Sequence, residues 1–224
     1  LYADVNIEGT VNLLEACRKN HVRKIVIASS SSVYGNTKET PFREDMSVDD
    51  PISPYAATKK ATELFASVYH NVYDMDVVLL RYFTVYGPGQ RPDLAIHKFT
   101  RFLFEEKEIP FFGDGTMKRD YTYIDDIIRG TTLALDWVEK NRHVCEVFNL
   151  GESRTVSLQE LMDFLAQKTG KKPRLRREPQ PPGDVDCTFA DLTKAASILG
   201  YEPGTPIEEG LDRFVQWCKS YYHY

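Results

Sequence analysis

The apolar positions in the first third of the chain follow two spacings. In residues 5–20 and 53–73 the apolar side chains recur at helical spacing, which predicts two helices. Ser53-Pro54 is a typical helix start. The short runs 24–29 and 77–82 are rich in β-branched and other apolar residues and do not alternate. Such runs are typical of strands that are buried on both faces of a parallel sheet.

A strand, a long helix and a second strand form a βαβ crossover, so the pattern predicts an open α/β sheet. In such sheets ligands bind outside the carboxyl ends of the strands. The polar segments 29–35 and 83–93 follow the two predicted strands directly. We therefore expect these two loops to meet at one site.

The rest of the chain has a mixed pattern without an internal repeat. Residues 171–183 are basic and rich in proline, which predicts a loop with room for one strand. Ser157 is placed to cap a helix. The expected helices are 95–106, 124–140, 157–169, 192–199 and 206–222, and the expected strands are 110–112, 119–123 and 144–150.

The composition narrows the function classes. The chain has 224 residues, 42% of them hydrophobic, which is ordinary for a globular protein and excludes disorder. A net charge of −5 offers no basic field for nucleic acid or an anionic membrane. No apolar run approaches the roughly 18 residues of a membrane span, and no signal-peptide pattern opens the chain. The four cysteines lack metal-ligand spacing. We expect a cytoplasmic protein without a metal.

The most informative chemistry is a serine-rich loop, residues 29–35, followed by Tyr55 and Lys59 at the start of the second helix. The i, i+4 spacing puts the phenol and the ammonium on one helix face. There the cation lowers the pKa of the tyrosine from about 10, and the tyrosinate becomes a general base toward an alcohol. A solvated surface pair is the alternative reading of these two residues alone.

At these residues the chain resembles the extended short-chain dehydrogenase/reductase family of nucleotide-sugar epimerases and dehydratases. The resemblance covers essentially the whole chain and implies a Rossmann-like sheet, NAD as cofactor and a UDP-sugar substrate. The matching stretches are residues 6–16, 29–35, 53–59, 81–88, 119–126, 148–151 and 183–185.

The resemblance implies roles for individual residues. Ser30 is the catalytic hydroxyl, Tyr55 is the base, and Lys59 binds the nicotinamide ribose. Ala28, Ser29 and Tyr82 complete the cofactor side of the site, together with Tyr55 and Lys59.

The family chemistry that follows is removal of hydride from C4 of the sugar, rotation of the 4-keto intermediate and return of the hydride to the other face. Dehydratases of the family carry an acidic pair just after the catalytic hydroxyl, and decarboxylases carry a Glu there. Here the positions are Ser31 and Ser32. The sequence therefore predicts an epimerase.

Within the family the chain is most similar to the UDP-glucuronate 4-epimerases, which interconvert UDP-glucuronate and UDP-galacturonate. Arg91, with Thr84, Ser31 and Ser32, offers a cation and hydroxyl donors for a sugar carboxylate. The alternative is that Arg91 is a solvated loop charge. A UDP-glucose or UDP-N-acetylglucosamine 4-epimerase is the second candidate.

For the nucleotide, the resemblance points to Arg119 at the diphosphate and to Asp184 at the uridine ribose. Arg119 has an alternative as a surface ion pair with Asp120 or Asp126. Many relatives also place an arginine where this chain has Pro181. Either arginine of the Arg176-Arg177 pair is a candidate replacement, although a solvated loop is the reading that we favour for the basic run 171–177.

The family's Gly-x-x-Gly-x-x-Gly turn, which binds the NAD pyrophosphate, is not found in these 224 residues. We therefore expect a partial Rossmann-like sheet without its N-terminal strands. Residues 1–90 would be the C-terminal part of an NAD-binding domain, and residues 91–224 mainly a smaller α/β sugar-nucleotide region with some chain returning to the sheet. A truncated epimerase, doubtful in activity alone, and a non-catalytic sugar-nucleotide-binding remnant both remain open.

Self-association is the last expectation. Dimers of the family bundle the helices that correspond to residues 5–18 and 55–73, and both segments carry apolar stripes here. The resemblance therefore implies a homodimer.

Overall fold

A three-stranded parallel sheet forms the base of the molecule. The computed structural model describes residues 1–179 and 185–224. Its strands are β1 (Lys24–Ala28), β2 (Asp76–Tyr82) and β6 (Cys145–Leu150), in the order β1-β2-β6. The register pairs Ile25 with Val77 and Leu79 with Val147. The predicted α/β class is confirmed, and β1 lies at one edge of the described sheet.

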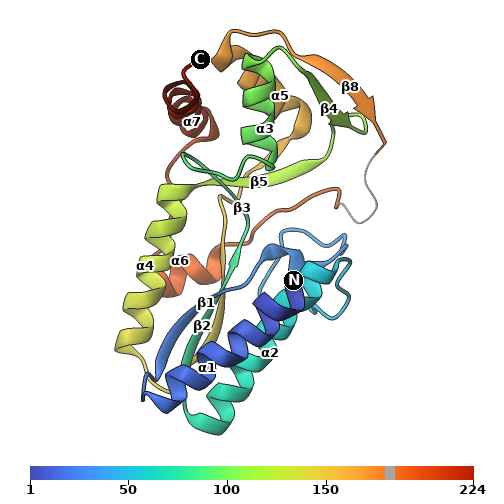
Figure 1. Cartoon of the computed structure of the whole chain (residues 1–224). Coiled ribbons are helices and arrows are strands. Elements are labelled where there is room, and N and C mark those ends of the chain that lie inside the picture. Colours follow the sequence, from blue (N-terminus) through green and yellow to red (C-terminus); the bar gives the residue numbers. More distant parts are fainter. Residues whose placement is uncertain (180–184) are drawn as a thin grey trace.

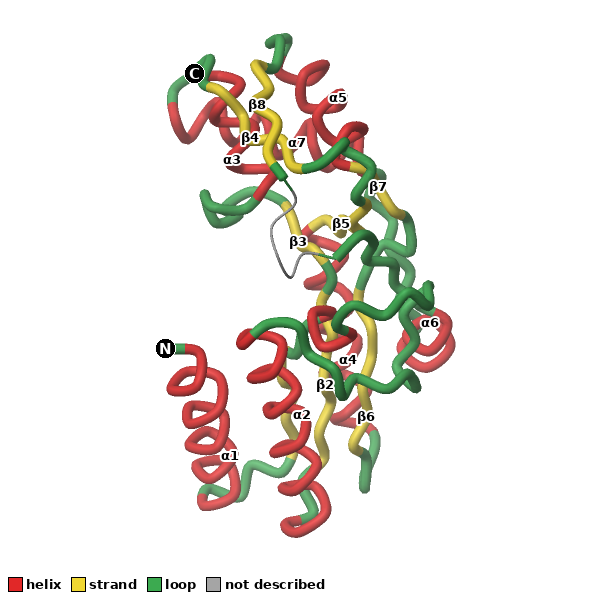
Figure 2. Tube along the Cα trace, turned by 90° about the vertical axis from the view of Figure 1, so that its right-hand side faces the viewer, coloured by secondary structure: helices red, strands yellow, loops and turns green. Residues whose placement is uncertain are grey.

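Helices cover both faces of this sheet (Figures 1 and 2). On one face, Val77 and Leu79 pack with α1 (Gly9–Lys19) and α2 (Pro54–Tyr73). On the other face, Val78 and Leu80 pack against α4 (Ile124–Lys140) and α6 (Thr193–Leu199). Residues 77–80 of β2 are at most 2% exposed, which explains the run of apolar residues without alternation.

The second region has its own core. It contains α3 (Ala95–Phe104), α5 (Leu158–Thr169) and α7 (Ile207–Tyr222). Its short sheets are β3-β5-β7 and the pair β4-β8. Since α4 and α6 come from this later part of the chain, the chain returns to the first sheet. The remaining strands are β3 (Thr84–Tyr86), β4 (Glu108–Phe112), β5 (Lys118–Tyr123), β7 (Thr155–Ser157) and β8 (Arg174–Glu178).

The expected helices and strands lie where the pattern put them, within two residues at their ends in most cases. Ser157 and Glu160 form the full capping box of α5. Three short elements were not predicted: β3, β7 and the 3₁₀ turn η2 (Ser31–Tyr34). Three or four residues are too few to show a period, which is why the pattern missed them. The first helix also begins with a π-helical segment, η1 (Ala3–Glu8).

Among residues 1–179 and 185–224, none of the helices combines the length and the hydropathy that crossing a bilayer requires.

Candidate active site

The serine loop begins where β1 ends. Ser29 continues the strand ladder, because its N–H donates to the Leu80 carbonyl at 2.8 Å. Ser30 is extended and caps η2: its Oγ accepts from the Ser32 N–H at 3.2 Å and from the Ser32 hydroxyl at 3.0 Å. Gly35 then turns the chain at φ 63°, where a Cβ would collide with the Asp50 carbonyl. The loop is therefore held by its own hydrogen bonds and by a position that requires glycine.

Tyr55 and Lys59 lie in the first two turns of α2, which Ser53 caps by accepting from the Ala56 N–H. The Lys59 ammonium donates to the Ala28 carbonyl at 2.9 Å and lies 5.9 Å from the centre of the Tyr55 ring. Burial lowers the pKa of Lys59. This hydrogen bond joins the start of α2 to the end of β1.

One cavity of about 200 Å³ gathers most of the predicted substrate residues. We call it the serine cavity. It brings the loop after β1 and the loop after β2 together, so the predicted convergence is confirmed. Its lining is Ser30, Ser31, Ser32, Gly35, Phe42, Ile52, Ser53, Thr84, Arg119, Val185 and Thr188.

A second cavity, of about 210 Å³, shares Arg119 with the first. We call it the aromatic cavity, and sequence reasoning did not find it. Flat apolar rings with a few charged groups suit a nucleobase and its attached phosphates. Its lining is Asp93, Ala95, Lys98, Phe99, Phe112, Met117, Arg119, Tyr121 and Leu158.

Arg91 is not among the residues that line either cavity. Its side chain is 73% exposed and is paired with Asp93, with Nε–Oδ1 at 3.1 Å and Nη2–Oδ2 at 2.6 Å. The guanidinium lowers the pKa of Asp93, which itself lines the aromatic cavity. Arg91 therefore stands beside the site with a carboxylate already bound, and its role toward a substrate stays a prediction.

The other residues predicted to bind the cofactor or the nucleotide lie outside the two cavities or outside the described residues. The Tyr82 hydroxyl shares a hydrogen bond of 2.9 Å with Thr131 on α4, and burial raises the pKa of Tyr82. Its place beside a nicotinamide stays a prediction. Asp184 and Pro181 lie outside the described residues. Arg176 and Arg177 lie in β8, where Arg176 pairs with Glu178 and Arg177 covers the Phe111 ring.

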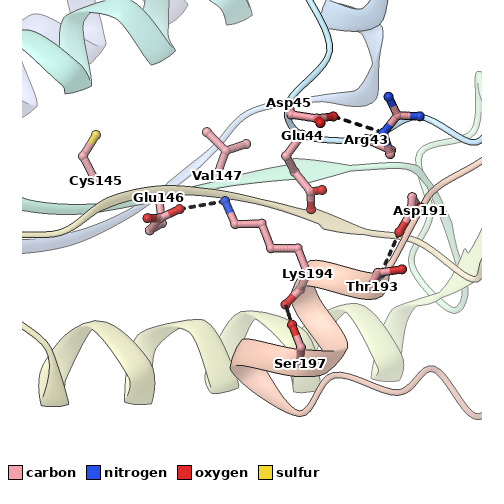
Figure 3. A pocket seen from close by; sticks show the side chains of 10 residues that line it. All are labelled: Arg43, Glu44, Asp45, Cys145, Glu146, Val147, Asp191, Thr193, Lys194 and Ser197. Carbon is pink, nitrogen blue, oxygen red and sulfur yellow. Dashed lines mark hydrogen bonds and ion pairs between the residues drawn. The ribbon is translucent and has the colours of Figure 1, made fainter.

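A larger cavity, of about 610 Å³, lies along β6 and contains none of the predicted residues (Figure 3). Its lining contains positive and negative side chains that form ion pairs. Lys194 pairs with Glu146 at 2.7 Å, and Arg43 pairs with Asp45 at 3.2 Å. Volume alone does not make it the site, because the convergent hydroxyls and the Tyr55–Lys59 pair lie elsewhere. Among the described residues, no group of three possible ligands could hold a metal ion.

The residues around the Lys59–Ala28 hydrogen bond fit one end of an NAD molecule. The Ala28 carbonyl, the half-buried Lys59 ammonium and Tyr55 lie at the carboxyl ends of parallel strands, where a nicotinamide ribose finds both donors and acceptors. These residues suit the nicotinamide end. The sequence contains no glycine-rich turn for the pyrophosphate.

The fold and this site define an extended short-chain dehydrogenase/reductase, a class that uses NAD as its cofactor. The family model described as GDP-mannose 4,6 dehydratase matches residues 1–214, and the chain belongs to this NAD-dependent epimerase/dehydratase family.

Several relatives in sequence and in structure are named as UDP-sugar 4-epimerases. A UDP-glucuronate 4-epimerase of Thermodesulfobacterium geofontis is 46% identical, over 98% of this chain and 67% of its own. The Bacillus cereus UDP-glucuronic acid 4-epimerase, solved with UDP-glucuronic acid and NAD, is 40% identical with a TM-score of 0.90, over 97% of this chain and 68% of its own. The Thermotoga maritima UDP-glucose 4-epimerase, solved with UDP-glucose, is 36% identical with a TM-score of 0.91, over 98% and 71%.

Proposed function

We propose that the protein containing this chain interconverts UDP-glucuronate and UDP-galacturonate at C4 with bound NAD. The observation that carries the proposal is the pair of cavities that meet at Arg119, one lined by hydroxyls and the other by aromatic rings. The sugar occupies the serine cavity, the diphosphate lies at Arg119, and the uracil enters the aromatic cavity. The names of two relatives, both UDP-glucuronate 4-epimerases, support the proposed reaction.

The chain's own residues perform the proton chemistry. When bound, NAD would supply the hydride acceptor and donor for C4 of the sugar, and Lys59 and Tyr55 would hold its nicotinamide ribose. Tyr55 removes the proton of the C4 hydroxyl as the hydride leaves, and the Ser30 hydroxyl holds the same oxygen. Lys59 contributes a positive charge one helical turn from Tyr55, 5.9 Å from the centre of its ring. Returning the proton from Tyr55 restores the starting state.

Substrate choice rests on the serine cavity. Ser31, Ser32 and Thr84 present hydroxyl donors, and none of the described residues that line the cavity carries a carboxylate to repel an acidic sugar. Arg91 binds the sugar carboxylate after its ion pair with Asp93 has opened, so that the substrate replaces Asp93 as its partner. The second candidate, a UDP-glucose or UDP-N-acetylglucosamine 4-epimerase, is favoured by the likeness to the Thermotoga maritima enzyme.

The test of the proposed function is conversion of substrate by the complete protein, followed by proton NMR at C4. UDP-glucuronate should give a mixture with UDP-galacturonate, and its kcat/KM should exceed that of UDP-glucose and UDP-N-acetylglucosamine. Faster conversion of either neutral sugar would favour the second candidate. Binding of UDP without conversion of any sugar would indicate the non-catalytic remnant.

We also propose that α1 and α2 form a homodimer interface. The two helices lie side by side on the outside of the sheet (Figures 1 and 2). Leu13 on α1 and Leu64, Val68 and Val72 on α2 are between 49% and 64% exposed. The three α2 residues recur every four positions and form one apolar stripe. A second copy that pairs the same helices would bury it.

The dimer predicts a change in sedimentation. Val68→Glu in the complete protein should raise the dimer dissociation constant more than about tenfold, because a carboxylate would be buried without a partner. Ile198→Glu, on α6 at 42% exposure, is the matched control and should leave the dimer intact. Equal sedimentation of Val68→Glu and wild type would contradict this interface.

A further inference from the structure

A buried ion pair lies directly behind the catalytic residues. Arg81 on β2 donates to Glu63 on α2 twice, from Nε to Oε1 and from Nη2 to Oε2, each at 2.9 Å. The two side chains are 3% and 6% exposed. The Ser29 hydroxyl, also buried, donates to the same Oε1 of Glu63 at 2.7 Å. The carboxylate therefore joins three segments: the end of β1, the end of β2 and α2.

This network shares one face of α2 with Tyr55 and Lys59. Glu63 follows Lys59 by one helical turn, and Lys59 follows Tyr55 by one turn, so all three share a face of α2. Ser29 lies between Ala28, whose carbonyl accepts from Lys59, and Ser30. The same two segments are thus joined twice, once by Lys59 at the site and once by Glu63 behind it.

The other side of Arg81 is also occupied. Its guanidinium carbon lies 4.8 Å above the ring of Tyr34, at the end of the serine loop's 3₁₀ turn. The Tyr34 hydroxyl in turn donates to Asn149 on β6 at 2.8 Å. Arg81 is consequently linked to both ends of the serine loop, to Ser29 through the Glu63 carboxylate and directly to the ring of Tyr34.

We propose that Glu63 and Arg81 are positioning residues, which fix Ser30 and the Ala28 carbonyl relative to Tyr55 and Lys59. The inference rests on the proposed function, because it takes these four groups as the reacting constellation. A bidentate, desolvated pair defines both distance and angle between α2 and the strand ends. Stability alone does not explain such a pair, since well-packed apolar residues often replace a buried ion pair without loss of stability.

The experiment uses the complete protein with NAD and the UDP-sugar that it converts. The double variant Glu63→Leu/Arg81→Met removes both charges together, and Ser29→Ala removes only the hydroxyl that links the pair to the loop. Asp76→Asn is the matched control, because it neutralises a buried carboxylate that accepts from the Val144 N–H at the far end of β2. The measurements are kcat and KM, the melting temperature and crystal structures.

We expect kcat to fall about 100-fold in the double variant and about tenfold in Ser29→Ala, with KM little changed, because small misplacements of reacting groups have effects of this size. A fall in kcat at an unchanged KM and melting temperature separates a positioning role from a general loss of stability. Crystal structures of the double variant should show the hydrogen bond between Lys59 and Ala28 lost, and Asp76→Asn should keep it together with full kcat.

Wild-type kcat in Ser29→Ala, or an unchanged Lys59–Ala28 hydrogen bond in the double variant, would overturn the positioning role. If the double variant does not fold, Ser29→Ala decides through the same measurements. A wild-type protein that converts no UDP-sugar would contradict the proposed function instead, while the crystal structures still test the positioning.

Discussion

Replacing Tyr55 with phenylalanine in the complete protein is expected to lower kcat about 1,000-fold, with UDP-sugar binding largely kept. The substitution removes one hydroxyl and keeps the ring that packs 5.6 Å from the ring of Tyr2. A positioned general base contributes about 10²- to 10⁴-fold to a rate. Since the base acts in the transition state, the loss should fall on kcat and not on KM. Steady-state kinetics with UDP-glucuronate measure both.

The matched control for this loss is Tyr2→Phe, which removes the hydroxyl of the neighbouring ring. Its kcat should stay close to that of the wild type, because Tyr2 has no place in the proton transfer. Turnover near wild type in Tyr55→Phe would exclude Tyr55 as the base.

Substituting Arg91 by alanine should weaken binding of UDP-glucuronate by about 2 to 5 kcal/mol, as for removal of one partner from a charge pair that the ligand buries. UDP-glucose should lose far less, because it carries no carboxylate. Isothermal titration of the complete protein with each sugar nucleotide measures the difference.

Asp93 offers the control for Arg91. In the present structure Asp93 holds the guanidinium, so it competes with the substrate carboxylate. Asp93→Asn should therefore keep or strengthen binding of UDP-glucuronate. Equal losses for both sugars in Arg91→Ala would show that Arg91 does not recognise the carboxylate, and would favour an epimerase of neutral sugars.

The sequence was sufficient for those parts of the site that follow from the geometry of helices and parallel strands. Since the carboxyl ends of parallel strands lie at one edge of a sheet, the pattern predicted that the loops 29–35 and 83–93 meet. The i, i+4 spacing predicted that Tyr55 and Lys59 share a helix face.

The aromatic cavity could not be predicted in this way. Its rings come from α3, β4 and β5, and only the packing of those elements brings Phe99, Phe112 and Tyr121 together.

The Glu63–Arg81 pair, in contrast, left a signal in the sequence. Arg81 interrupts an apolar strand, and a buried guanidinium needs a carboxylate. Glu63, one turn after Lys59, was the available partner.

The Ser53 cap described above has a consequence for the electrostatics of catalysis. Because the capped helix of 20 residues begins at Pro54, Tyr55 lies in its first turn, where the aligned peptide dipoles leave a partial positive charge. An anionic group beside the start of the helix is favoured there, as at other helix N-termini that bind anions. The backbone of α2 therefore adds a fixed positive potential to the charge of Lys59 at this edge of the site.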